Sequence, residues 1–168
     1  MVEMQLAAVR VELPTNTPVV LLQEAEGARR TLPIFIGPFE ASAIAEALQG
    51  VQRPRPMTHD LMRDLLNAAG LVVERVVITD LREGTFFAEI HLRQGDQAFT
   101  VSSRPSDAMA LAARTGTPIY AEDALLDAEG VIFSESEDDE ENEGGDPDEL
   151  VDQFKEFIEG VRPEDFTS

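Results

Sequence analysis

The sequence predicts an α+β fold built from a strand–hairpin–strand–helix unit that occurs twice. Two observations lead to this prediction. In both halves of the chain, short apolar or alternating runs are followed by a stretch whose apolar residues recur at helical spacing. In addition, residues 40–45 match residues 107–112 in the order carboxylate, alanine, variable, alanine, aliphatic, alanine. The repeat would place Glu40 and Asp107 at equivalent helix N-termini.

The first half reads as three strands and a helix. The predicted strands cover residues 4–13, 19–22 and 32–36. Residues 24–30, which include Gly27, join the last two strands as a hairpin. A helix follows from Gly37 to Gly50, because its apolar residues share one face and glycine commonly ends a helix.

A stiff loop and one additional helix separate the first half from the second, which then repeats the order of strands followed by a helix. Residues 53–56 read Arg-Pro-Arg-Pro, and proline disrupts helices and central strands. Thr58 is predicted to cap a second helix, 59–69, that ends at Gly70. Three strands, a third helix and a last strand are then predicted at 71–79, 85–93, 97–102, 104–116 and 118–121.

Charge is distributed unevenly along the 168 residues, whose formal net charge is −20. Residues 134–168 hold 15 acids and two bases, which gives −13, whereas residues 1–133 hold 18 acids and 11 bases, which gives −7. This balance excludes a basic protein that coats nucleic acid. Nucleic acid, if it is the partner, should bind weakly and in a salt-sensitive way.

Three regions follow from these patterns: a folded domain over 1–133, an acidic linker over 134–146, and an amphipathic helix with its tail over 147–168. The linker has no apolar residue, so we expect it to be disordered. The last region opens with a capping signal at Asp146 and carries an apolar stripe of Leu150, Phe154, Phe157, Ile158 and Val161. Such a stripe needs a docking surface, either on this domain or on a protein partner.

Several classes of protein are excluded by what the chain lacks. It has no cysteine, so disulfides, thiolate metal sites and a cysteine nucleophile are excluded. Its two histidines, His59 and His91, cannot form a three-histidine zinc site. No apolar run approaches the length of about 20 residues that crosses a bilayer, and the N-terminus does not resemble a signal peptide. We therefore expect a cytoplasmic protein without membrane association.

Polar side chains gather around the predicted start of the second helix: Arg53, Arg55, Thr58, His59 and Asp60. A helix N-terminus with arginines suits an anion such as phosphate, and histidine can move a proton near neutral pH. The same residues also fit a simple helix start with solvated arginines, and the pattern alone leaves both interpretations open.

A second polar group opens the third helix. Arg104, Ser106 and Asp107 again place an arginine before a helix start, and Glu40 occupies the corresponding place in the first helix. The alternative interpretation is that the acids only stabilise the helix dipole and that the arginine is a surface residue.

The order of these motifs resembles one known family. They are the runs Leu32-Pro33-Ile34-Phe35-Ile36-Gly37, Glu40-Ala41, Ile44-Ala45, Arg55-Pro56-Met57-Thr58-His59-Asp60-Leu61, Val77-Ile78-Thr79-Asp80-Leu81, Gly84-Thr85-Phe86-Phe87-Ala88, Arg104-Pro105-Ser106-Asp107-Ala108 and Pro118-Ile119-Tyr120. Over about residues 5–125 the chain resembles the bifunctional nuclease domain family, and the acidic stretch with a closing helix is similar to the form in actinobacterial members.

The resemblance implies a mixed, barrel-like sheet with flanking helices, and metal-assisted nuclease activity on DNA and RNA. The family usually has an aspartate and a small residue before its Arg-Pro-Ser-Asp motif, where this chain has Ser102-Ser103. If the missing acid is a metal ligand, activity would be weakened or lost.

Under a nuclease hypothesis, each of the polar residues at the predicted helix starts can be given a chemical role. Glu40, Asp60 and Asp107 would hold Mg²⁺ or Mn²⁺, since hard cations prefer oxygen ligands, and the metal would activate water. His59 would act as base or acid beside these catalytic carboxylates. The residues expected to bind the substrate are Arg53, Arg55, Thr58, Arg104 and Ser106.

Three other hypotheses stay open. The polar residues could form a non-catalytic module that binds an anionic ligand or a protein, or they could stabilise a homo-oligomer. The acidic tail, residues 134–168, could also compete with nucleic acid for the arginine loops, as an alternative to acting as a solvated spacer.

Overall fold

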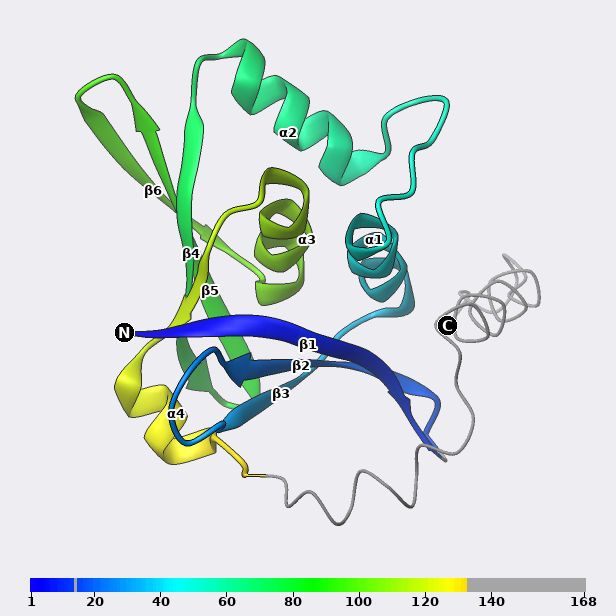
Figure 1. The fold of residues 1–168 in the computed structure, drawn as a ribbon, viewed down its shortest axis with the longest axis vertical. Helices are drawn as coiled ribbons and strands as arrows, with labels where there is room; N and C mark the ends of the chain where they lie inside the picture. The colour runs from blue at the N-terminus through cyan, green and yellow to red at the C-terminus, as the bar shows by residue number, and fades with distance from the viewer. Residues whose placement is uncertain (14, 133–168) are drawn as a thin grey trace. The chain divides into compact units, whose positions relative to one another are not determined.

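The computed structural model describes residues 1–13 and 15–132 (Figure 1). The predicted acidic linker and the predicted helix over 147–168 lie outside the described residues, and so does any contact of the tail. The elements are β1 (Val2–Glu12), β2 (Thr17–Glu24), β3 (Thr31–Phe35), α1 (Pro38–Leu48), α2 (Thr58–Ala68), β4 (Val72–Arg82), β5 (Thr85–Gln94), β6 (Gln97–Ser103), α3 (Pro105–Thr115), β7 (Ile119–Ala121) and α4 (Asp123–Glu129).

Seven strands form one mixed sheet in the order β3-β2-β1-β7-β4-β5-β6. The short central strand β7 pairs antiparallel with β1 and parallel with β4. From this centre the two antiparallel meanders, β1-β2-β3 and β4-β5-β6, extend in opposite directions, and each is followed by a helix, α1 or α3. The α+β class and the duplicated strand–helix unit are therefore confirmed.

The predicted barrel-like sheet does not close. In the described part of the chain, β3 and β6 are the two edges, and no ladder joins them. Strand β3 instead makes an isolated antiparallel bridge between Thr31 and Val131, and Pro33 within β3 lacks an N–H for a further ladder.

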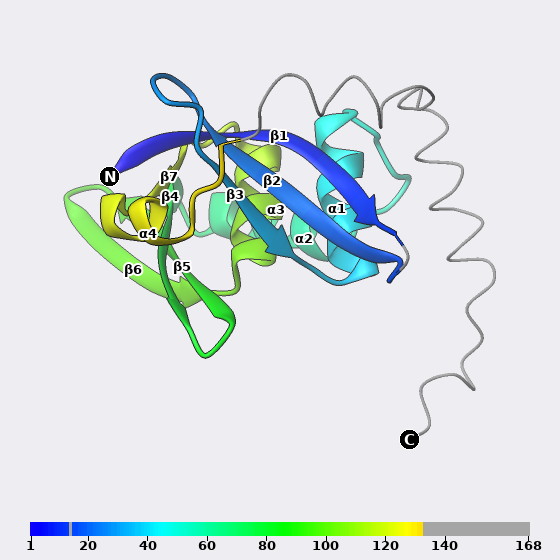
Figure 2. The ribbon, with the colours of Figure 1, turned by 90° about the horizontal axis from the view of Figure 1, so that it is seen from below.

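Helix α3 lies at the centre of the hydrophobic core (Figures 1 and 2). It packs against α1, α2, β4 and β5. Its residues Pro105, Ser106 and 108–112 are buried. Three of these are alanines, whose small side chains allow neighbouring elements to approach closely. The N-terminus of α3 is thereby held between the two halves of the molecule.

Two-residue turns join β4 to β5 and β5 to β6, where Arg82 pairs with Thr85 and Gln94 with Gln97. Glu83 and Gly84 both adopt positive φ, 49° and 74°, as a two-residue turn between twisted antiparallel strands requires. Several elements differ from the sequence prediction, and β2 and β4 extend beyond their predicted ends. Strand β1 begins at Val2, and helix α4 was not predicted, because its seven residues bury only Leu125 and Leu126 and show too little periodicity.

Within the described residues, no helix is both long enough and apolar enough to cross a membrane.

Candidate functional site

Three helices present an acid at the third position of their first turn. These acids are Glu40 in α1, Asp60 in α2 and Asp107 in α3. Acids there interact favourably with the helix dipole. Helices α1 and α3 also start with proline, whose fixed φ suits the first helical position. Helices α1 and α2 both pack on α3.

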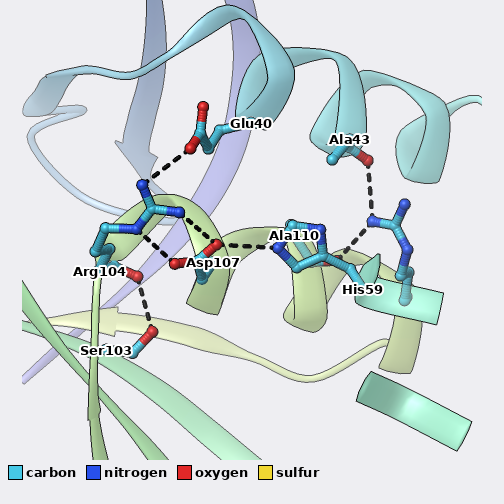
Figure 3. Close-up of polar contacts among 8 residues, drawn as sticks. Glu40, Ala43, His59, Ser103, Arg104, Asp107 and Ala110 are labelled. Carbon is cyan, nitrogen blue, oxygen red and sulfur yellow. Dashed lines mark hydrogen bonds and ion pairs between the residues drawn. The ribbon is translucent and has the colours of Figure 1, made fainter. Parts of the chain in front are cut away.

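Arg104 joins the two carboxylates that the sequence repeat predicted to be equivalent (Figure 3). Its Nε donates to Asp107 Oδ2 at 2.7 Å and its Nη2 to Asp107 Oδ1 at 3.0 Å. Its Nη1 donates to Glu40 Oε1 at 2.9 Å. The pseudo-equivalent acids therefore meet on one guanidinium, and these hydrogen bonds raise the pKa of Arg104 above its ordinary value.

His59 contacts the same carboxylate from the other side. Its Nε2 lies 3.1 Å from Asp107 Oδ1, and the residue is buried. An ionised carboxylate can only accept hydrogen bonds, so Nε2 carries the proton, and in the neutral imidazole Nδ1 holds the lone pair. Asp107 thus sets the tautomer of His59, which leaves Nδ1 as the basic atom of the ring.

Asp107 is ionised in this setting. Burial acts to raise the pKa of its carboxyl group, but the hydrogen bonds from Arg104 and His59 outweigh burial and hold the pKa below its ordinary value. A permanent negative charge therefore lies between a permanent cation and a histidine.

Asp60 belongs to a different contact. Its Oδ1 accepts from Arg114 Nε at 2.6 Å, and its Oδ2 accepts from the backbone N–H of Met57 at 3.0 Å. Arg114 also donates to the carbonyl groups of Ala43 and Ala110, each at 2.9 Å. Its side chain is 6% exposed, so this arginine ties α1, α2 and α3 together from inside.

Arg114 was missed in the sequence prediction. An arginine in the last turn of a helix is ordinarily a favourable partner of the helix dipole, and nothing in the local sequence points to Asp60. The available signal is a charged residue only two positions after the buried stretch 108–112.

The three carboxylates that were predicted to hold a metal ion each pair with an arginine. Their oxygens suit a hard cation, but Glu40 and Asp107 share Arg104 while Asp60 pairs with Arg114. Among residues 1–13 and 15–132, no group of three or more His, Asp or Glu side chains is placed to hold a metal ion. The predicted metal site stays a prediction.

The predicted substrate-binding residues are divided between two places. Arg104 and the buried Ser106 lie at the start of α3, beside the carboxylates. Arg53 pairs with Glu46 and lies outside the group formed by His59, Arg104 and Asp107. Arg55 is exposed. Thr58 is exposed and is not the helix cap, because the Met57 carbonyl accepts the first helical hydrogen bond, from Leu61 at 2.8 Å.

Gly37 was also missed, although it precedes Glu40 in the repeat. A Cβ atom at this position would collide with Oε2 of Glu40. Gly37 has φ of −75°, so glycine is not required by its backbone conformation. The glycine leaves room for the Glu40 carboxylate to reach Arg104.

The ion pair between Asp60 and Arg114 predicts a loss of stability in acid. Hydrogen bonds from Arg114 and Met57 outweigh burial and lower the pKa of Asp60 below its unfolded value. A group with a lowered folded pKa stabilises the fold above its unfolded pKa, and this contribution disappears as the pH falls. We expect the free energy of unfolding to be level above about pH 5 and to fall below about pH 4.

Urea unfolding at several pH values checks this expectation, with Asp60→Asn as the comparison. The variant should be less stable than the wild type at pH 7, and the difference between them should narrow toward pH 3. A difference that is independent of pH would contradict the assignment of Asp60 as an ionised partner of Arg114.

The fold and the cluster together define a class: a two-halved α+β protein with histidine, arginine and carboxylates at converging helix starts. Residues 20–134 match the bifunctional nuclease domain. The chain belongs to the bifunctional nuclease domain family, which confirms the resemblance of its motifs.

Relatives fall into two groups. An uncharacterized protein of Mycobacterium tuberculosis is 48% identical over 164 residues, which cover 98% of this chain and 97% of that protein. Bifunctional nuclease 2 of Arabidopsis thaliana is 30% identical over 129 residues, and Bifunctional nuclease 1 of the same plant is 25% identical over 122 residues. The two plant matches cover 74% and 71% of this chain, which spans 39% and 38% of the plant proteins' length.

Proposed function

We propose that this chain is a nuclease that hydrolyses phosphodiester bonds of DNA or RNA at the cluster of His59, Arg104 and Asp107. One observation carries the proposal: a single ionised carboxylate holds both a histidine and an arginine. Phosphodiester hydrolysis needs a proton carrier and a cation beside the phosphate, and these two residues supply both. Membership of the bifunctional nuclease domain family supports the same reaction class.

Arg104 is suited to bind the phosphate. Its side chain is 64% exposed, although it pairs with two carboxylates. A guanidinium has five N–H donors, and the three bonds to Glu40 and Asp107 use three of them. The two that remain can donate to phosphate oxygens without loss of the ion pairs, so the carboxylates fix the orientation of Arg104 while it binds substrate.

His59 is the proton carrier of the proposed reaction. Its Nδ1 takes a proton from the attacking water as the new oxygen–phosphorus bond forms. The proton then passes to the oxygen of the ester bond that breaks. Asp107 stabilises the imidazolium that exists between the two transfers, and it stays ionised itself.

Nucleic acid binding should be weak in this proposal. Arg104 is offset by Glu40 and Asp107, and residues 1–133 carry 18 acids against 11 bases. Binding therefore depends on a few local contacts and should weaken with added salt.

Replacement of Arg104 by lysine tests the role of this residue in cleavage. Lysine keeps the charge, but its single ammonium cannot bond both carboxylates and the phosphate in one plane. We expect kcat/KM for a labelled oligonucleotide to fall by about 100-fold. Arg53→Lys is the matched control, since Arg53 lies outside the cluster, and it should leave the rate almost unchanged. Equal losses in the two variants would contradict a specific role for Arg104.

The predicted divalent cation, Mg²⁺ or Mn²⁺, remains a separate proposal. The same cleavage assay, run in Mn²⁺, in Mg²⁺ and after chelation, measures it. Activity that survives chelation would assign the reaction to the protein's own side chains. Activity that is lost on chelation and restored by either ion would support the metal.

A non-catalytic module is the alternative function. The observation that favours it is that Glu40, Asp60 and Asp107 each already pair with an arginine, as in a purely structural network. Thermal unfolding with added oligonucleotides or nucleotides tests it, since a ligand of the native state raises the midpoint. Stabilisation without any cleavage would favour the module. The homo-oligomer and the docking of residues 147–168 stay predictions.

A further inference from the structure

We infer that a cavity beside Arg104 binds one unpaired nucleobase, so that the substrate is single-stranded nucleic acid. The inference rests on the proposed nuclease function and extends it to a substrate class. Three features of the molecule support it: the position of the cavity, the chemistry of its walls, and the continuity between the cavity and the phosphate-binding arginine.

The cavity lies where the two halves of the molecule meet. It has a volume of about 380 Å³ and opens to solvent. Its walls come from the end of β3 with the loop to α1, from the β4–β5 turn, and from the start of α3. The lining residues are Ile34, Phe35, Ile36, Gly37, Gly84, Thr85, Phe86, Arg104, Pro105 and Ser106. A volume near the lower end of the range for small-molecule sites, about 300–1,000 Å³, suits a ligand part as small as a base.

The walls have the chemistry that binds a base. Phe35 and Phe86 supply aromatic surface, and Phe35 is 56% exposed at the end of its strand. Bases stack on such side chains regardless of their sequence. Thr85 and Ser106 add hydroxyl groups that can pair with the polar edge of a base. Although the chain carries a net charge of −20, no lining residue is acidic, and Arg104 is the charged residue in the wall.

The cavity is continuous with the proposed reaction site, because Arg104 belongs to both. A base held against Phe35 would therefore have its own phosphate within reach of the free donors of Arg104. Bases in a duplex are stacked and paired, and extrusion of one base costs a few kcal/mol. A single strand offers its bases without that cost, so the cavity selects single strands.

Fluorescence anisotropy with a labelled single-stranded DNA tests the inference, with phosphorothioate linkages in the strand to slow cleavage. Two exposed phenylalanines provide a matched pair of variants. Phe35 lines the cavity, whereas Phe39 in α1 is 60% exposed and does not line it. We expect Phe35→Ala to weaken binding by about 5- to 100-fold, as loss of one stacked base predicts, and Phe39→Ala to change it little.

Two further probes sharpen the test. A hairpin duplex of the same sequence and a strand with abasic sites should both bind the wild type more weakly than the intact single strand. Equal affinity for single strand and duplex, or equal effects of Phe35→Ala and Phe39→Ala, would overturn the inference. If either of these results is found and cleavage still occurs, only the inference of a base-binding cavity is contradicted. If Phe35-dependent binding occurs without cleavage, the proposed nuclease function has failed and the base site stands.

Discussion

Replacement of His59 by alanine is expected to lower the rate of phosphodiester cleavage by about 10²- to 10⁴-fold, the usual contribution of a positioned acid or base. The reason is geometric. The Nε2 proton of His59 is held by Asp107, and this leaves Nδ1 as the basic atom. Alanine removes the proton carrier but leaves Arg104 bonded to both carboxylates, so binding of the substrate should change much less than the rate of cleavage.

The chain provides a matched control in its other histidine. His91 lies in β5, where Arg75 Nη2 is 3.2 Å from its Nδ1, and it makes no contact with the cluster. His91→Ala should cleave at nearly the wild-type rate. Steady-state kinetics with a labelled oligonucleotide, together with thermal unfolding of each variant, measures both effects. Equal rates for the wild type and both variants would show that the activity belongs to a contaminant.

Replacement of Arg114 by alanine should give the largest loss of stability. Arg114 is 6% exposed and bonds Asp60 and two carbonyl groups. Removal of one partner of a buried ion pair costs about 3–5 kcal/mol, because the other charge is left uncompensated. Since Asp60 is 23% exposed and can recover some hydration, we expect about 3 kcal/mol, measured as the free energy of unfolding in urea.

An arginine on the surface of α2 is the control for this prediction. Arg63 pairs with Asp64, and both side chains are more than a third exposed. Exposed pairs contribute about 0–1 kcal/mol, so Arg63→Ala should have a small effect. If Arg114→Ala and Arg63→Ala lose the same stability, Arg114 does not hold the three helices together.

The repeat in the sequence accounts for one contact that the structure shows. Glu40 and Asp107 occupy the same place in two copies of one unit, so their meeting on Arg104 follows from the pseudo-symmetry of the fold. His59 was found because it lies in a dense polar segment at a helix start.

Long-range contacts account for what was missed. Asp60 and Arg114 are 54 residues apart, and no periodic pattern connects them. The hydrogen bonds that Asp60 accepts from Arg114 and Met57 were therefore not predicted, and its role as a metal ligand stays a prediction. Arg53 was grouped with the site because of its position in the chain, but the loop turns its side chain to Glu46. Sequence proximity to a helix start does not determine the direction of a side chain.

The central claim is that Asp107 positions both His59 and Arg104 for one reaction. A cleavage assay on Asp107→Asn, His59→Ala and the double variant tests it most directly. Because the residues act as one unit, we predict that Asp107→Asn alone loses cleavage severely and that the double variant is only slightly worse than the worse single variant. Full cleavage by Asp107→Asn, or losses that multiply in the double variant, would contradict the account.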